Sequence, residues 1–97
     1  MKMRKRYRIL LLLVLITAPA LAQNALPVDV TRFVEQRDSC DHFRGEEAYD
    51  AERGKFLEEQ MRKLCTGTDK KLKALKAKYR KNPGVLSRLK EYEPQIE

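Results

Sequence analysis

The sequence has little of the chemistry from which enzyme and metal sites are built. Its 97 residues include two cysteines and a single histidine, His42. The cysteines lack the Cys-x-x-Cys spacing of redox proteins, and zinc sites usually assemble three or four well-spaced Cys, His or acidic ligands. No enzyme motif is present, and a small helical domain leaves little room for a cleft in which His42 would meet a nucleophile or acid. We therefore expect a non-enzymatic protein with no metal and no other cofactor.

Strand patterns are also missing. No segment alternates apolar and polar residues as a half-buried strand does, and the chain has no glycine-rich linker, internal repeat or low-complexity tract beyond one lysine-dense stretch. Apolar residues instead recur at helical spacing. The sequence therefore predicts an all-α fold, with three or four short helices in one small domain formed by residues 23–97.

The one long apolar run lies near the N-terminus and is typical of an export signal. Basic residues without any acid precede it, and Pro19 and two small alanines follow it, ahead of Gln23. The residue directly after the expected cleavage site is Gln23 and not a cysteine, which disfavours a lipoprotein. The 14 residues 9–22 span about 21 Å as a helix, short of the roughly 30 Å of a bilayer's hydrocarbon core. We therefore expect residues 1–22 to be a cleaved signal peptide helix, in preference to an uncleaved anchor. The mature protein would lie in the periplasm or be secreted, with membrane contact only before cleavage.

Charge is distributed unevenly along the predicted mature chain. Five of the 21 Lys and Arg residues lie in the signal peptide and all 14 Asp and Glu residues follow it, so the mature chain carries a formal +2. Residues 23–59 hold five basic residues against ten acidic ones, whereas residues 60–97 hold eleven against four. The two halves therefore differ in sign, at −5 and +7.

The two cysteines, Cys40 and Cys65, form an even pair in a chain that we expect to be exported. In an oxidising compartment such a pair is typical of a structural disulfide, although reactive or metal-binding thiols are the alternative. Closing this loop would stabilise the fold by roughly 3.5 kcal/mol in the chain-entropy model. A simple helical hairpin turning at Gly45 would place the cysteines about 20 Å apart at ~1.5 Å per residue. The bond therefore predicts an irregular stretch at residues 44–50 that runs back in extended form, or a steep crossing of the helices.

Four helices are expected from the apolar spacing and from the residues that start and stop helices. They cover residues 30–43, a segment that begins between 46 and 51 and ends at 65, residues 69–81, and a segment that starts at 83 and ends before 94. The expected N-caps are Asp29 or Thr31 for the first helix, Thr68 for the third, and Asn82 with Pro83 for the fourth. Gly45 and Gly67 would end the first two helices, and Gly54 allows a break inside the second. Six aromatic residues are spaced as core, namely Phe33, Phe43, Tyr49, Phe56, Tyr79 and Tyr92.

The densest cluster of chemically capable side chains is Cys40-Asp41-His42-Phe43-Arg44-Gly45-Glu46-Glu47. Its candidate partner-binding residues are Asp41, His42, Arg44, Glu46 and Glu47, which would contact a protein of the cell envelope. A metal site built on these acids and His42 is disfavoured, because Cys40 is expected to be oxidised. The remaining interpretation is an ion-paired surface segment, in which Arg44 and Arg53 satisfy Glu46, Glu47 or Asp50.

A second candidate surface is the lysine-dense stretch of residues 70–81. Its basic residues are Lys70, Lys71, Lys73, Lys76, Lys78, Arg80 and Lys81. Such a stretch can bind anionic envelope polymer, anionic lipid or an acidic protein, or it can simply be a solvated face. Nucleic acid is not an expected partner, because we expect the chain to be exported and only Tyr79 is interleaved with the charges.

Two motifs resemble those of a known family. The segment Cys40-Asp41-His42-Phe43-Arg44-Gly45-Glu46-Glu47, followed 18 residues later by Cys65-Thr66-Gly67-Thr68-Asp69, is similar to a family of small exported proteobacterial two-cysteine proteins of unknown function. The resemblance covers most of the mature chain. It implies a cell-envelope setting and a two-cysteine helical domain, but no activity or ligand. A looser similarity to small two-cysteine helical lysozyme-inhibitor-like proteins rests only on size, export and cysteine usage.

Together these patterns favour a periplasmic or secreted protein-interaction module, whose partner in the envelope the sequence does not identify. The alternative is a protein that binds anionic cell-envelope material through the basic helix from Lys70 to Lys81.

Overall fold

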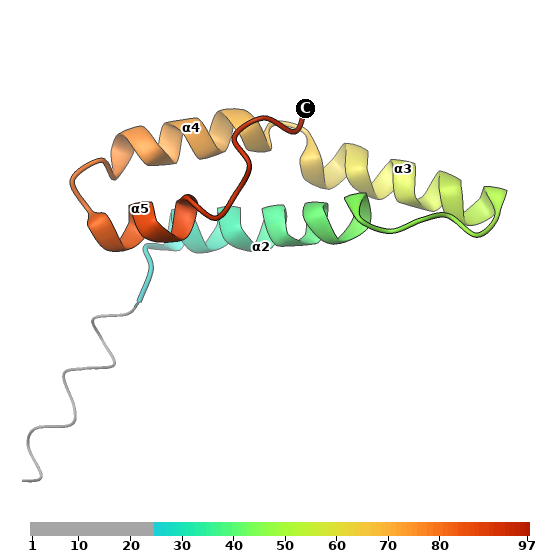
Figure 1. Ribbon diagram of the computed structural model, residues 1–97, viewed down its shortest axis with the longest axis horizontal. Helices are drawn as coiled ribbons and strands as arrows, with labels where there is room; N and C mark the ends of the chain where they lie inside the picture. Colours follow the sequence, from blue (N-terminus) through green and yellow to red (C-terminus); the bar gives the residue numbers. More distant parts are fainter. Residues whose placement is uncertain (1–24) are drawn as a thin grey trace, which may run out of the picture.

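The computed structural model describes residues 25–97, which form four α-helices and, within that range, no strand (Figure 1). The helices are α2 (Val28–Arg44), α3 (Ala51–Cys65), α4 (Thr68–Lys78) and α5 (Pro83–Leu89). Figure 1 shows α3 and α4 following one another along one side of α2. The predicted all-α fold is confirmed, whereas the predicted signal peptide and its cleavage site lie outside the described residues. No helix within residues 25–97 has the length and apolar character needed to span a bilayer.

Several helix ends follow local sequence signals. α5 begins as predicted, with Pro83 at its first position and the Asn82 side chain accepting the backbone N–H three residues on at 3.1 Å. α3 has a similar cap, because the Asp50 carboxylate accepts a backbone N–H of its first turn at 2.7 Å. This helix continues through Gly54 without a break, and α2 ends at Gly45 as expected.

Two of the predicted caps are wrong. α2 begins at Val28, directly after Pro27, so neither Asp29 nor Thr31 occupies the N-cap. The proline ring sets the φ of Pro27 at −57°. The Asp29 carboxylate instead accepts hydrogen bonds from Lys78 and Tyr79 at the end of α4. Thr68 is the first helical residue of α4, because the preceding glycine takes the N-cap position with a φ of 84°. That left-handed backbone region is accessible to glycine at little cost.

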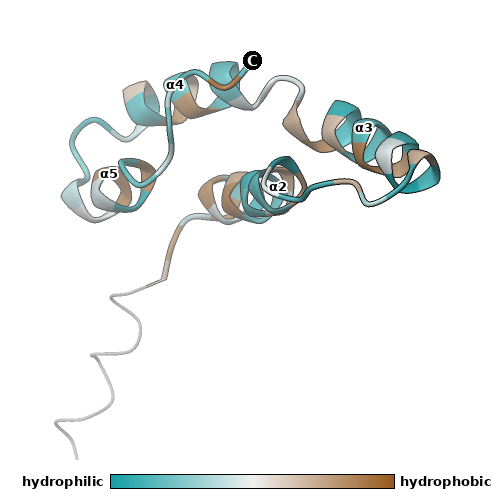
Figure 2. Cartoon of the chain, turned by 45° about the vertical axis from the view of Figure 1, so that its right-hand side comes forward, coloured by the Kyte–Doolittle hydropathy of each residue, from teal (hydrophilic) through white to brown (hydrophobic). Residues whose placement is uncertain are grey.

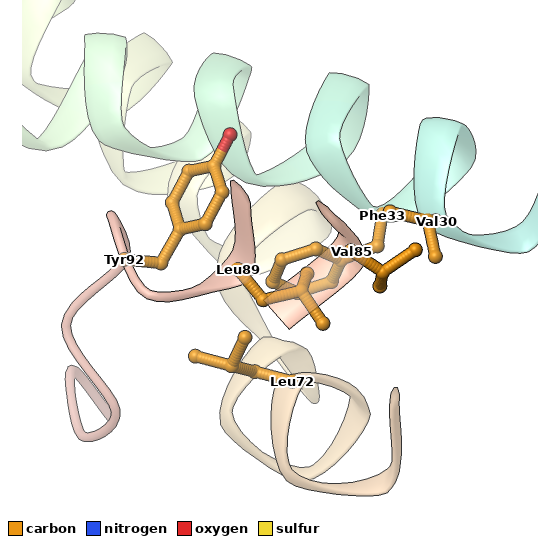
Figure 3. Packing of buried hydrophobic residues seen from close by; sticks show 6 residues of the cluster. All are labelled: Val30, Phe33, Leu72, Val85, Leu89 and Tyr92. Atoms are coloured by element: carbon orange, nitrogen blue, oxygen red, sulfur yellow. The ribbon is translucent and has the colours of Figure 1, made fainter. Parts of the chain in front are cut away.

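The main hydrophobic core lies between α2, α4, α5 and the turn that follows α5 (Figure 3). Its six buried residues are Val30, Phe33, Leu72, Val85, Leu89 and Tyr92. Phe33 and Tyr92 meet edge to face with ring centroids 5.5 Å apart. The Tyr92 hydroxyl donates to Asp38 at 2.7 Å. No residue of α3 belongs to this core, and only Leu57 and Cys65 of that helix are buried. α3 therefore depends on other contacts to stay in place.

The disulfide between Cys40 and Cys65 attaches α3 to α2, so the predicted staple is confirmed, with Cα atoms 5.1 Å apart. The predicted irregular stretch is also present, at residues 45–50. Its direction differs from the expected one, because Figure 1 shows it continuing outward from α2 while α3 returns alongside it. Residues 45–50 carry the chain outward beyond the end of α2, and the 15 residues of α3, about 22 Å long as a helix, carry it back. This return brings Cys65 next to Cys40.

A buried arginine interrupts the apolar side of α2. The Arg37 side chain is fully excluded from solvent, and its Nε donates to Asp41 at 3.0 Å. Its Nη2 donates to the Glu93 backbone carbonyl at 2.9 Å, and its guanidinium lies 5.6 Å from the centroid of the Tyr92 ring. These contacts hold the segment that follows α5 against the middle of α2.

Candidate functional site

The five candidate residues between Cys40 and Tyr49 divide into two groups. Asp41 accepts hydrogen bonds from Arg37 and Arg44, the latter at 3.2 Å. Glu46 forms an ion pair with Arg53 through two guanidinium nitrogens, one of them at 3.0 Å. These three candidates, Asp41, Arg44 and Glu46, are therefore engaged in contacts within the chain. The expected pairing of Arg53 with Glu46 is present, whereas Arg44 pairs with Asp41 and with Glu93 at 3.8 Å.

His42, Arg44 and Glu47 are the exposed members of this set, and Arg44 is engaged by Asp41 and Glu93, which leaves His42 and Glu47. Neither forms an ion pair within residues 25–97, and the His42 ring lies edge to face against Phe43 with centroids 5.2 Å apart. These two side chains remain available to a partner.

Aromatic residues gather at the same end of the molecule. Phe43 and Phe56 meet edge to face with centroids 5.9 Å apart, and the Arg53 guanidinium lies 4.8 Å from the centroid of Phe56. Tyr49 is 80% exposed and Phe56 is 42% exposed, so the expectation that both are core residues is wrong. We call Phe43, Tyr49 and Phe56 the aromatic tip. Tyr49 is exposed because it lies on the irregular stretch beyond the end of α2, away from the core.

A small hollow opens beside the aromatic tip. It has a volume of about 240 Å³ and is lined by Tyr49, Asp50, Glu52, Arg53 and Phe56. Two carboxylates and one guanidinium therefore surround two exposed rings. A surface of this kind can receive an apolar side chain of a partner and offer charged groups at its edge.

The seven basic residues of the lysine-dense stretch do not form one face. Lys71 donates to the Gln36 side chain at 2.9 Å, and Lys78 lies 2.6 Å from Asp29, so both face α2. The Tyr79 hydroxyl also donates to Asp29, at 2.7 Å. The hydrogen bonds from Lys78 and then Tyr79 lower the pKa of Asp29, and the bond to Asp29 raises the pKa of Lys78. Lys71 and Lys78 therefore help to attach α4 to α2.

Three of the remaining lysines line a groove on another side of α4. Lys70, Lys73 and Lys76 lie on one wall, and Pro94, Gln95 and Glu97 form the other wall. We call this feature the lysine groove. Its volume is about 770 Å³, and it is wide open to solvent. Figure 2 shows the hydrophilic residues of α4 and, in front of them, the C-terminal segment. Arg80 donates to a backbone carbonyl at 3.5 Å and Lys81 is exposed, and neither lines the groove.

A reciprocal pair of carboxylates holds the second wall in place. The Asp69 carboxylate accepts the backbone N–H groups of Ile96 and Glu97, each at 3.0 Å. The Glu97 carboxylate accepts the backbone N–H groups of Gly67 and Asp69, at 2.9 and 3.1 Å. The hydrogen bond from the Glu97 backbone is the main reason that the pKa of Asp69 is lowered. We call this arrangement the Asp69–Glu97 clamp.

The groove wall and the exposed aromatic residues are the features that sequence reasoning missed. The clamp joins residues 28 positions apart, and no local pattern signals such a contact. The exposure of Tyr49 could have been predicted, because Tyr49 belongs to the stretch that the disulfide geometry predicted to be irregular. Within residues 25–97, no group of three or more His, Cys, Asp or Glu side chains is placed to hold a metal ion.

No family model matches the chain, and no curated protein or solved structure is significantly similar to it. The family resemblance carried by the two cysteine-containing motifs therefore remains a prediction.

Proposed function

We propose that this chain is an exported, non-enzymatic interaction module that binds a protein of the cell envelope through the aromatic tip, with His42 and Glu47 beside it. The observation that carries the proposal is the exposure of two large aromatic residues, Tyr49 and Phe56, at one end of a small molecule. Aromatic side chains are enriched among the residues that dominate binding energy at protein interfaces.

The tip is held in one arrangement before any partner arrives. The Asp50 cap fixes the start of α3, the Glu46–Arg53 ion pair joins the irregular stretch to that helix, and the disulfide fixes the other end of α3. A surface that is already ordered loses little conformational entropy on binding. This order favours a binding role for the tip over that of a flexible connection.

Export to the periplasm or medium is supported by the pattern of residues 1–22 and by the disulfide. Structural disulfides persist in oxidising compartments and are rare in the cytosol. Cell fractionation with N-terminal sequencing tests this part, and we expect the mature chain to begin at Gln23. Recovery of the uncleaved chain with reduced cysteines from the cytosol would refute it.

The binding proposal is tested by site-specific crosslinking in intact cells. A photo-crosslinking amino acid at position 49 should capture one defined protein, whereas the same group at position 28 should not. Val28 is a matched control because it is apolar, 67% exposed and located at the start of α2. Equal capture of the same protein from both positions would argue against a specific surface.

Purified partner then gives the affinity test. Tyr49→Ser should weaken binding by about 2 kcal/mol, or roughly thirtyfold, if the ring is a central contact. Val28→Ser should leave the affinity unchanged, and His42→Ala and Glu47→Ala should have smaller effects. An unchanged affinity for Tyr49→Ser would contradict the proposal.

A second candidate function is the binding of anionic envelope material through the basic helix. The lysine groove favours it, because Lys70, Lys73 and Lys76 form no ion pair within residues 25–97. Such binding should weaken steeply as salt is raised, since it depends on exposed charges. Salt-independent retention on an anionic matrix would argue against it.

A further inference from the structure

We propose that the lysine groove binds a single amphiphilic anion, with a phosphate-type headgroup held by the lysines and an alkyl chain lying along the groove. This inference rests on the second candidate function and names its ligand class. It is independent of the aromatic tip.

The charges in the groove favour an anion. Lys70, Lys73 and Lys76 follow one another at intervals of three residues, about 4.5 Å apart along the helix axis. Two neighbouring ammonium groups can therefore reach one phosphate. The groove also contains two carboxylates, Asp69 and Glu97, but both accept backbone N–H groups in the clamp. Neither one pairs with a groove lysine in the part of the chain that the structure describes.

Apolar groups in the same groove favour an alkyl chain. Leu72, a core residue that is 1% exposed, lies beneath its base, and Pro94 lies on the opposite wall. The methylene stems of the lysines supply most of the remaining apolar lining while their ammonium groups remain in water. The groove is open to solvent, with a volume of about 770 Å³, so a bound alkyl chain would lie along its surface. A bare inorganic anion would leave this apolar surface uncovered.

The arrangement of the basic residues disfavours a long polyanion. A polymer is bound best by a continuous stripe of charge, but Lys71 and Lys78 face α2 and are engaged by Gln36 and Asp29. The groove therefore presents three lysines beside an apolar base, which matches one headgroup and its chain more closely than a repeating chain of charges.

The test measures binding of alkyl phosphates of increasing length to the purified protein, by NMR and calorimetry below the critical micelle concentration. Inorganic phosphate provides the charge without the chain, and octyl glucoside provides the chain without the charge. Octyl phosphate should bind more tightly than both, with affinity rising about two- to fourfold for each methylene that enters the groove. The backbone signals of Lys73, Lys76 and Gln95 should shift together.

Variants assign the binding to the groove. The double variant Lys73→Gln/Lys76→Gln should weaken octyl phosphate binding by about tenfold. The control Lys55→Gln/Lys90→Gln removes the same charge from exposed lysines outside the groove and should have no effect. Equal weakening by both pairs would overturn the site, because it would indicate a response to net charge alone.

The remaining outcomes separate this inference from the function on which it rests. If inorganic phosphate or polyphosphate binds as tightly as octyl phosphate, the groove is a simple anion site, and the amphiphile inference is overturned while the second candidate function survives. If no anion binds, both are overturned. If octyl glucoside binds as tightly as octyl phosphate, the lysines have no role in recognition, and the inference fails on that ground.

Discussion

Removal of the disulfide should release α3 while the rest of the fold persists. The perturbation is Cys40→Ser/Cys65→Ser, which opens a loop whose ends are 25 residues apart in sequence. In the chain-entropy model such a loop contributes about 3.5 kcal/mol. The loop contains the whole of α3, and no residue of α3 belongs to the main hydrophobic core.

The contacts that remain hold α3 mainly through partly exposed side chains, among them the Phe43–Phe56 ring pair, which contributes about 1 kcal/mol. Burial of Leu57 contributes about 2 kcal/mol, and the hydrogen bond from the Gln36 side chain to the Leu64 carbonyl, at 2.8 Å, contributes about 1 kcal/mol. The partly exposed ion pair of Arg53 adds at most about 1 kcal/mol. A helix of 15 residues is itself only marginally stable in water. Loss of the disulfide contribution therefore brings α3 close to the point of local unfolding.

Hydrogen exchange and circular dichroism measure this effect. α3 supplies 15 helical residues against 17, 11 and 7 in α2, α4 and α5, so its loss alone would remove just under a third of the helical signal. Amide protection should fall in α3 and persist for Phe33, Leu72 and Leu89. A single cooperative loss of all four helices, or full protection of α3 in the variant, would refute the reasoning.

Three further predictions concern single residues. Burial and then the hydrogen bond to Asp38 raise the pKa of Tyr92 from 10.0 to about 12. The contribution of Tyr92 to stability is therefore complete below about pH 10 and falls by up to about 2 to 3 kcal/mol as the pH rises towards 12. In chemical denaturation, Tyr92→Phe should flatten the decrease in stability over this alkaline range. Because the pKa of Asp69 is lowered, its stabilisation of the clamp is complete above its ordinary value of 3.8 and is lost as the pH falls below it. The Ile96 amide signal should therefore shift on acidification in the wild type and shift less in Asp69→Asn. Gly67→Ala should lower the free energy of unfolding by about 1 kcal/mol, because the backbone at Gly67 has a φ of 84°. An added Cβ meets nothing within 4 Å, so the loss comes from the backbone, and Gly67→Asn should lower the free energy of unfolding by less. Equal losses for the two variants would contradict the backbone explanation.

Local chemistry made much of the fold predictable from the sequence. Asn82 and Pro83 form a cap that depends on neighbouring residues alone, so their role was correct. The disulfide could be predicted from the oxidising compartment that we expect for the chain. The irregular stretch could be predicted from the separation that a simple hairpin would impose on Cys40 and Cys65. The predicted cap of the first helix failed because of contacts between distant segments. Aspartate is a residue type that is favoured at N-caps, but the Asp29 side chain is held by Lys78 and Tyr79, some 50 residues away.

The candidate sites were harder to predict for the same reason. The sequence placed charged residues at 41–47 and 70–81, but it did not indicate which of them would be engaged within the chain. Asp41 and Glu46 pair with Arg37 and Arg53. Lys71 and Lys78 are bound by side chains of α2. The residues that remain available are therefore a subset that only the three-dimensional arrangement defines.

The length of residues 45–50 sets where α3 begins its return, and therefore where Cys65 lies relative to Cys40. Deleting one residue there would shorten the outward path by at most about 3.3 Å. The Cα atoms of Cys40 and Cys65 are 5.1 Å apart, within a permitted range whose width is only about 2.4 Å. The thiols would then lie out of register unless α3 lost residues in proportion. Chain length in this stretch is thus constrained by covalent chemistry, whereas the Tyr49 side chain, which is 80% exposed, is not constrained by packing.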